Sequence, residues 1–274
     1  MGLAKGSAVT IGAYDGVHIG HRQVIGLVRR RAAEDGLRSV VVTFDKNPAA
    51  VVNPASAPPR LTDIDLKLEL LTKTGVDQIL VLAFDAERAK EKAEDFVTEV
   101  LLGQLAVRVV VVGDDFHFGN ERRGNVALLR TMGEVAGFSV EPVHLVSDEW
   151  EHKVVSSTRI RRLIGAGELA EAHALLGRPH EVRGCVVTAR GRDTTGEPSR
   201  LLLEIPGEIL LPPPGDYLGS LVADDGTAMT TARILLPERA GGDLQRFEVL
   251  PAETSAASTL FDTATGQVVR ARFA

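Results

Sequence analysis

Short apolar runs alternate with longer segments of helical period along the first two thirds of the chain. The runs are rich in β-branched residues, which is typical of buried parallel strands. The alternation predicts an α/β domain with a doubly wound parallel sheet. Strands are expected at residues 8–11, 39–44, 78–83, 107–112 and 138–142. Helices are expected at residues 19–35, 63–74, 93–105, 125–136, 156–164 and 169–176.

The pattern changes after residue 180. Gly, Pro, Thr and Asp interrupt short alternating runs such as "RLLLEI", "DYLGSLVA" and "QVVRARF". Such runs predict a small antiparallel β-barrel or sandwich. A chain of 274 residues is long enough for two hydrophobic cores. We therefore expect two domains, residues 1–178 and 181–274, joined by the linker "GRPHEVRG".

Composition and charge narrow the possible partners. The net charge of −6 carries no electrostatic signature of a nucleic-acid-binding protein, so no nucleic-acid partner is expected. A single cysteine, Cys185, cannot form an internal disulfide, which fits a reducing compartment. No apolar run approaches the roughly 18 residues that a membrane span needs. These features predict a cytoplasmic protein without a membrane partner, and they leave the oligomeric state open.

The segment "GAYDGVHIGH" follows the first expected strand. In a doubly wound sheet, ligands bind beyond the carboxyl ends of the strands. Gly12 and Gly16 would let the backbone approach a ligand, and His18 and His21 stand where a helix begins and attracts anions. The segment predicts a phosphate site. Two alternatives are a pair of surface histidines that cap a helix and a two-histidine zinc site.

The segment "VSSTRIR" opens a later expected helix. Ser156, Ser157 and Thr158 are hydroxyl residues that can cap any helix. Together with Arg159 and Arg161, however, they favour phosphate, because the guanidinium group can grip a phosphate through two N–H groups.

A third segment, "GDDFHFGNERRG", follows the fourth expected strand. It places the pair Asp114 and Asp115 just before two aromatic residues and a glycine. This pattern predicts an acidic and aromatic wall for a planar ligand, with Arg122 or Arg123 reaching an anion. An ordinary solvated turn is the alternative.

Taken together, these segments resemble the H-x-G-H nucleotidylyltransferases. Within that group the chain is similar to the flavin adenylyltransferase module of bacterial bifunctional riboflavin kinase/FAD synthetases, over about 180 residues. The matching stretches are "GAYDGVHIGHRQVI", "VVTFDKNP", "GVDQILVLAFD", "VVVGDDFHFGNERRG", "VSSTRIRRLIGAGELAEAHALLGRP" and "VRGCVV". The resemblance implies transfer of AMP from ATP to FMN, giving FAD and pyrophosphate, with Mg²⁺ assisting.

The resemblance also implies roles for particular residues. The catalytic residues would be His18, His21 and Arg161. ATP would bind at Gly12, Tyr14, Asp15, Gly16, His18, His21, Ser156, Ser157, Thr158 and Arg161. The flavin would bind at Phe44, Asn47, Pro48, Asp115, Phe116, Phe118 and Arg122.

The chain departs from the family pattern after the second expected strand. Family members tend to read "TFDPHP", whereas this chain has Lys46 and Asn47 in "TFDKNP". Another flavin phosphate or another small phosphorylated acceptor therefore stays an alternative to FMN.

A larger departure lies in the second domain. Riboflavin kinase modules carry a "PTAN" segment whose Thr and Asn serve ATP and magnesium, and here "GEPSRLLLEI" has Arg200 and Leu201 instead. Glu248 in "RFEVL" matches the kinase's carboxylate base. We expect a degenerate kinase-like β-barrel without kinase activity. A bifunctional enzyme and a non-catalytic flavin- or nucleotide-binding module are the alternatives.

Overall fold

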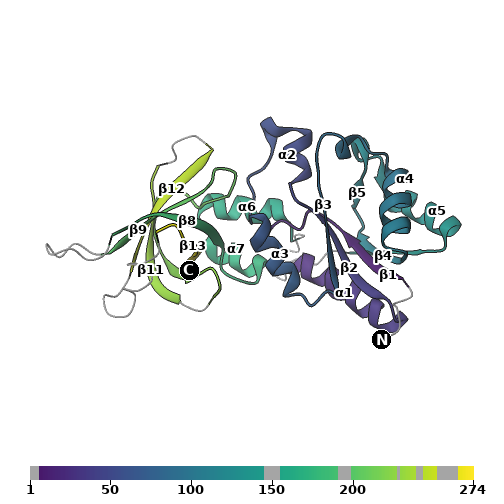
Figure 1. Ribbon diagram of the computed structural model, residues 1–274, viewed down its shortest axis with the longest axis horizontal. Helices are drawn as coiled ribbons and strands as arrows, with labels where there is room; N and C mark the ends of the chain where they lie inside the picture. Colours follow the sequence, from purple (N-terminus) through teal and green to yellow (C-terminus); the bar gives the residue numbers. More distant parts are fainter. Residues whose placement is uncertain (1–5, 145–154, 191–198, 227–228, 239–242, 252–264) are drawn as a thin grey trace. The chain divides into compact units, whose positions relative to one another are not determined.

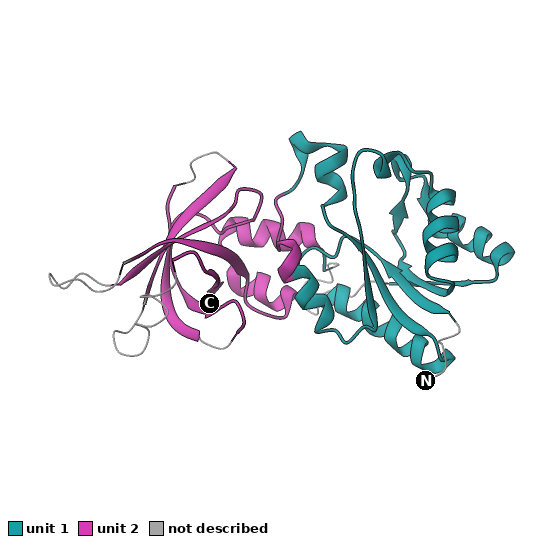
Figure 2. Ribbon diagram, in the orientation of Figure 1, with its two compact units in different colours: residues 1–58, 67–156 teal, residues 59–66, 157–274 magenta. Residues whose placement is uncertain are grey.

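The computed structural model describes residues 6–144, 155–190, 199–226, 229–238, 243–251 and 265–274 (Figure 1). The chain forms two compact units, Met1–Pro58 with Lys67–Ser156 and Pro59–Leu66 with Ser157–Ala274 (Figure 2). This division groups residues 157–178 with the barrel, whereas we expected them in the first domain. The domain limits expected from the sequence, 1–178 and 181–274, stay a prediction. Each unit is described by itself.

The first unit is built on a five-stranded parallel sheet, as predicted. The strand order is β3-β2-β1-β4-β7. The bounds are β1 Ser7–Ile11, β2 Arg38–Phe44, β3 Gln78–Leu82, β4 Val107–Gly113 and β7 Ser139–Val143. From β1 the chain adds β2 and then β3 on one side of the sheet. It then crosses over and adds β4 and β7 on the other side of β1. The strand order therefore reverses between β1 and β4, and a ligand crevice is expected at their carboxyl ends.

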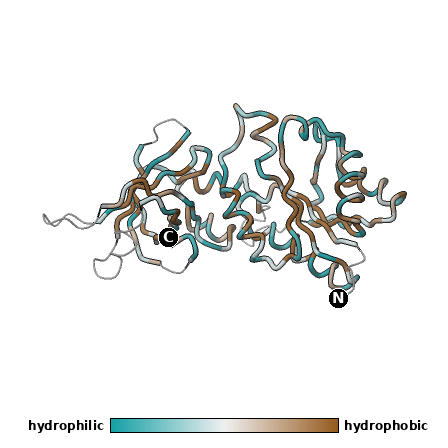
Figure 3. The backbone as a smooth tube through the Cα atoms, in the orientation of Figure 1, coloured by the Kyte–Doolittle hydropathy of each residue, from teal (hydrophilic) through white to brown (hydrophobic). Residues whose placement is uncertain are grey.

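Apolar side chains cover both faces of this sheet, whose strands are largely brown in Figure 3. Valines of β1, β2 and β4 pack on one face against α4 Ala93–Phe96, η3 Val97–Gln104 and α5 Val126–Ala136. On the other face, Val109 and Val111 of β4 pack against Val24 and Val28 of α1 Ile19–Asp35. Burial on both faces explains why the strands are continuous apolar runs without alternation.

The predicted helices are present, with one structural difference. The segment expected as a regular helix at residues 93–105 consists of α4 and the π-helix η3. The Leu105 N–H donates to the carbonyl oxygen of Val100, five residues back, at 3.1 Å. An apolar period over three turns does not distinguish this wider turn from an α-helix.

Several short elements were not predicted. They are α2 Pro48–Val52, η1 Pro54–Ser56, η2 Arg88–Lys90, η4 Asn120–Arg122 and the two-stranded pair β5 His117–Phe118 and β6 Gly124–Asn125. Sequence signals exist for α2, because Asn47 caps it by accepting a hydrogen bond from the Ala49 N–H and proline occupies its first position. The remaining helix of this region, α3 Ile64–Thr72, was predicted, and the Asp63 carboxylate caps it.

The second unit contains a closed six-stranded antiparallel β-barrel, so the barrel expectation is confirmed over the sandwich. The order is β10-β11-β12-β9-β8-β13. The bounds are β8 Glu181–Arg190, β9 Arg200–Pro206, β10 Gly215–Ala223, β11 Met229–Leu236, β12 Leu244–Pro251 and β13 Val268–Phe273. Leu203, Ile234, Phe247 and Phe273 fill its interior. The same unit includes α6 Ser157–Ala166 and α7 Leu169–Leu176.

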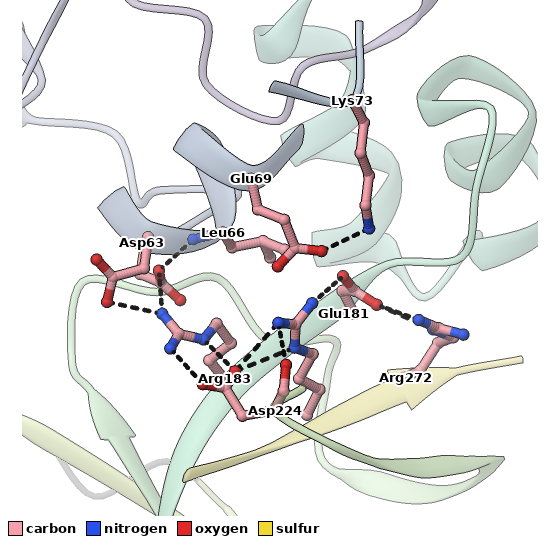
Figure 4. A network of polar contacts seen from close by, with 10 residues as sticks. Asp63, Leu66, Glu69, Lys73, Glu181, Arg183, Asp224 and Arg272 are labelled. Atoms are coloured by element: carbon pink, nitrogen blue, oxygen red, sulfur yellow. Dashed lines mark hydrogen bonds and ion pairs between the residues drawn. The ribbon is translucent and has the colours of Figure 1, made fainter. Parts of the chain in front are cut away.

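An ionic network on the barrel holds the segment before α3 (Figure 4). Arg183 donates to both carboxylate oxygens of Asp224 at 2.9 Å, to Asp65 at 2.8 Å and to Asp63 at 3.3 Å. Arg270 contacts the same Asp224 carboxylate. The hydrogen bond from Arg183 is the largest influence on the Asp224 carboxyl and lowers its pKa.

Replacing Arg183 by alanine is expected to lower the free energy of unfolding by about 1–3 kcal/mol, because carboxylates that it satisfies lose their donor. The side chain of Arg183 is 15% exposed. Arg233, which is 51% exposed and pairs with Asp216, is the matched control, and Arg233→Ala should cost at most about 1 kcal/mol. Urea unfolding at neutral pH measures both. Equal losses in the two variants would contradict the special role of Arg183.

The network also predicts a pH dependence. The folded-state pKa of Asp224 is lower than its unfolded value, so its stabilising contribution is fully present above the unfolded pKa of about 4 and is lost as the pH falls through the lower folded pKa. The stability difference between wild type and Arg183→Ala should therefore shrink below about pH 4.

Candidate active site

The turn after β1 adopts a strained backbone. Tyr14 and Val17 have φ angles of 51° and 39°, and Gly16 has a φ of 80°. A positive φ is unfavourable for a β-branched residue such as Val17 and costs on the order of 1–3 kcal/mol. Strain of this kind is typical of segments that are shaped for a ligand.

His18 and His21 lie together at the start of α1, where the sequence placed them. His18 is the N-cap, and its Nδ1 accepts a hydrogen bond from the backbone N–H of His21 at 3.3 Å. The two imidazole rings stack with their centroids 3.5 Å apart. His18 is buried, with 3% of its surface exposed. The capping alternative is thus correct for His18 in geometry, but the residue does not lie on the surface.

The glycine inside "HIGH" has a packing reason. A Cβ atom on Gly20 would lie 3.3 Å from Cε1 and Nδ1 of His18, closer than ordinary contacts. Because Nδ1 of His18 accepts a hydrogen bond, the proton of the neutral ring lies on Nε2. The ring N–H of His18 therefore lies at a helix start, where backbone N–H groups favour an anion.

Tyr14 and Lys67 stabilise this turn through hydrogen bonds. The hydroxyl of Tyr14 is hydrogen-bonded to Thr10 at 2.7 Å, and burial raises the pKa of Tyr14, so the phenol stays neutral. Lys67 is 5% exposed, and its ammonium donates to the carbonyl oxygens of Phe44 at 2.6 Å and Ala13 at 3.4 Å. This buried cation joins the end of β2 to the turn after β1. The sequence analysis missed it, because lysine in a predicted helix is usually exposed.

The other predicted ATP residues occupy separate places in the chain. Asp15 is buried in the strained turn, and Ser156 is the last residue of the first unit. Ser157 and Thr158 begin α6 in the second unit. The Nε atom of Arg161 donates to the carbonyl oxygen of Pro59 at 2.7 Å. The roles of these residues toward ATP stay predictions.

A cavity of about 680 Å³ opens beside the turn, entirely within the first unit. Ile11, Gly12 and Ala13 contribute to its lining from the end of β1 and the turn that follows. Five phenylalanines also line it: Phe44, Phe84, Phe96, Phe116 and Phe118. The rings of Phe44 and Phe84 meet edge to face at 5.2 Å, and those of Phe116 and Phe118 stack at 5.4 Å. Aromatic walls and this volume suit a planar organic ligand.

The structure brings most of the predicted flavin residues into this cavity. Its lining includes Phe44, Asn47, Pro48, Phe116, Phe118 and Arg122. Asp115 is exposed and is not among the lining residues, and its carbonyl oxygen is 2.7 Å from Nδ1 of His117. The flavin role of Asp115 therefore stays a prediction that the cavity does not support. Arg123 pairs with Glu121 at 2.5 Å, which leaves Arg122 as the lining arginine of that segment.

Several lining residues were missed by sequence reasoning. They include Phe84, Arg88, Glu91 and Phe96. Phe84 follows β3 directly, so the rule that sites lie at strand carboxyl ends could have found it. The Asp45 carboxylate places it by accepting the Phe84 N–H at 2.8 Å. No comparable local signal marks Arg88 or Glu91.

Two further observations concern metals and membranes. Within the described ranges, no group of three or more His, Cys, Asp or Glu side chains is arranged to hold a metal ion. Among the helices that the structure describes, none is both long and apolar enough to cross a membrane.

A doubly wound sheet with an H-x-G-H helix start at the point of strand reversal is the arrangement that the resemblance to the H-x-G-H nucleotidylyltransferases predicts. The family model for FAD synthetase matches residues 2–159, more than half of the chain. The chain therefore belongs to the FAD synthetase family.

Curated relatives agree with this assignment. The chain is 38% identical over 183 residues to a bifunctional riboflavin kinase/FMN adenylyltransferase of Pseudomonas fluorescens, which covers 67% of this chain and 58% of that protein. It is 34% identical to the protein of that name in Escherichia coli strain K12, over 67% of this chain and 58% of the relative. The Buchnera aphidicola subsp. Schizaphis graminum relative of the same name is 32% identical, with 68% and 59% covered. The matches thus span less than three fifths of these relatives.

A solved structure resembles almost the whole chain. It is titled a macrolide-efflux protein from Streptococcus pneumoniae and matches with a TM-score of 0.79 at 25% sequence identity. The match covers 99% of this chain and 85% of the other. The fold likeness therefore includes the residues of both units.

Proposed function

We propose that this protein transfers AMP from ATP to FMN, giving FAD and pyrophosphate. One observation carries the proposal: the turn that leads from β1 to His18 and His21 also contributes Gly12 and Ala13 to the wall of the aromatic cavity. A planar ring in the cavity and a phosphate at the helix start would thus belong to one crevice. FMN joins a flat ring system to a phosphate in a single molecule.

The reaction needs little covalent chemistry from the protein. An oxygen of the FMN phosphate attacks the α-phosphorus of ATP, the new P–O bond forms, and the bond from that phosphorus to the bridging oxygen breaks as pyrophosphate leaves. The nucleophile is already an anion, so no base is needed. In this proposal His18 and His21 donate ring N–H groups to the charge that develops at the α-phosphate.

Mg²⁺ belongs to the same proposal. When bound with the triphosphate, it would neutralise charge on the departing pyrophosphate. Mg²⁺ in such sites is usually held by substrate phosphates, water and one or two carboxylates. Among the described residues no group of three or more His, Cys, Asp or Glu side chains is arranged to hold a metal ion by itself, and the β1 turn contains one buried carboxylate, Asp15. This residue set fits a metal that arrives with its nucleotide.

The helix α6 is proposed to complete the nucleotide site. Ser157 and Thr158 stand at its start, and Arg161 follows one turn later. Hydroxyl groups and a guanidinium group at a helix start suit the triphosphate. The support for this part is the resemblance of "VSSTRIR" to the family motif.

A different phosphorylated acceptor is the second candidate. Asn47 replaces the usual histidine of the family's "TFDPHP" segment, and in the structure Asn47 both caps α2 and lines the cavity. The cavity wall therefore differs from the family pattern at one position next to the ligand.

Flavin binding separates the two candidates. We expect FMN fluorescence to be quenched on binding, because the ring enters a cavity lined by aromatic side chains. A phosphorylated acceptor without a planar ring, such as glycerol phosphate, should not displace FMN at similar concentrations. If FMN did not bind, or if glycerol phosphate displaced it at similar concentrations, a flavin acceptor would be contradicted.

A further inference from the structure

One wall of the aromatic cavity carries an ion pair. Arg88 and Glu91 both line the cavity, and Nη1 of Arg88 donates to the two carboxylate oxygens of Glu91 at 2.9 Å each. Their side chains are 28% and 15% exposed. A few well-placed polar groups in an apolar cavity usually set the orientation and identity of its ligand.

The chain holds this pair in place from both sides. The Asp85 carboxylate accepts the backbone N–H of Arg88 at 2.8 Å, and this hydrogen bond lowers the pKa of Asp85. On the other side, the Asn120 N–H donates to the Glu91 carbonyl oxygen at 2.8 Å, and its side-chain amide donates to the Lys90 carbonyl oxygen at 3.3 Å. The segment 85–91 is therefore tied to the segment around Asn120.

The segment around Asn120 is itself tightly constrained. Gly119 has a φ of 71°, and a Cβ atom there would lie 2.7 Å from the backbone nitrogen of Ala93. Glu121 and Arg122 have φ angles of 53° and 58°. Strained backbone persists only where its surroundings require it, so the wall that carries Arg88 and Glu91 is pre-organised.

The charges of the pair favour a neutral polar group over a phosphate. Glu91 neutralises Arg88, and a carboxylate on the same wall would repel a phosphate dianion. Within the part of the chain that the structure describes, Nε and Nη2 of Arg88 donate no hydrogen bond. The wall therefore offers N–H donors next to a carboxylate acceptor.

We propose that Arg88, oriented by Glu91, recognises the imide edge of the flavin ring. This inference rests on the proposed function and names the group that selects its acceptor. The imide edge has two carbonyl oxygens on either side of one N–H, so it accepts and donates hydrogen bonds side by side. Arg88 donates to a ring carbonyl oxygen, and the Glu91 carboxylate is the acceptor for the ring N–H. The FMN phosphate is then left to the turn of His18 and His21.

The test compares FMN use by the wild type and Arg88→Met, which keeps an apolar stem but loses every donor. We expect the KM and Kd for FMN to rise roughly 10- to 100-fold, the range for losing a hydrogen bond to a charged group. The KM for ATP should change little, and the variant should stay folded with a modest fall in Tm, because Glu91 loses its donor. Arg130→Met is the matched control, because Arg130 is exposed on α5 and does not line the cavity.

A second comparison needs no substitution. FMN methylated at the ring N–H between the two carbonyl groups should bind the wild type at least about tenfold more weakly than FMN does, and Arg88→Met should discriminate less. Equal binding of both flavins by the wild type would overturn the proposal, as would an Arg88→Met variant with unchanged FMN affinity or with equal losses for ATP and FMN. Failure of the wild type to bind FMN at all would instead contradict the proposed function.

Discussion

Replacing His21 by alanine is expected to lower the turnover of ATP and FMN about 10²–10³-fold, or roughly 2.7–4 kcal/mol of transition-state stabilisation. His21 lies in the first turn of α1, stacked on His18 at 3.5 Å and edge-on to Tyr14 at 5.0 Å. Its backbone N–H, which bonds to His18, is kept in the variant. The melting temperature should therefore stay close to that of the wild type. Steady-state turnover and thermal unfolding measure the two effects.

His18 needs a different substitution, because it also caps α1. In His18→Asn the side-chain oxygen can still accept a helix N–H, so the cap is kept while the imidazole is lost. A similar loss of turnover is expected with a folded protein. If either variant turned over FMN at the wild-type rate, or if both lost activity only by unfolding, the histidines would not be the phosphate donors.

The second large effect concerns the barrel, which we expect not to phosphorylate riboflavin. Phosphoryl transfer to a hydroxyl group needs a base and a metal held against the phosphates. Glu248 could serve as the base, but Nη1 of Arg200 lies 3.6 Å from its carboxylate. A cation at that position opposes Mg²⁺. Leu201, in the neighbouring position, is fully buried in the barrel and has no metal-binding atom. Pro198, the first residue matched to the kinase motif, lies outside the described residues.

A riboflavin kinase assay tests this expectation: the protein is incubated with riboflavin and Mg-ATP, and the same preparation is incubated in parallel with FMN and Mg-ATP. No FMN should form above the no-enzyme control, while the FMN reaction proceeds. Formation of FMN at an ordinary enzymatic rate, together with its loss in Glu248→Gln, would show that the barrel is an active kinase.

Much of the first unit can be read from the sequence because its signals are local. The helix α1, from Ile19 to Asp35, was predicted to the residue, since it begins directly after His18 of "HIGH" and ends before Gly36 in the left-handed region. The bounds of β1 and β4 were predicted to within one residue at each end, from the short run "AVTI" and from a valine-rich run. The rule that ligands lie beyond strand ends then located the turn of His18 and His21 and much of the aromatic wall.

The parts that could not be predicted depend on contacts between distant segments. The pair of Arg88 and Glu91 reads as a solvated charge run, and only the hydrogen bonds to Asn120, some thirty residues later, place it in a cavity wall. Lys67 is similar, because its burial depends on carbonyl oxygens of Ala13 and Phe44. Asp115 shows the opposite case: its sequence position beside Phe116 suggested a shared wall, but the turn leaves its side chain exposed.

The central claim is that the turn of His18 and His21 serves AMP transfer to a flavin phosphate. Mass analysis of products from purified protein, Mg-ATP and FMN tests it most directly, with riboflavin in place of FMN as the acceptor control. The account predicts FAD and pyrophosphate in equal amounts from FMN, and neither from riboflavin. Release of pyrophosphate without FAD, or no product from FMN while another phosphorylated acceptor gains AMP, would contradict it.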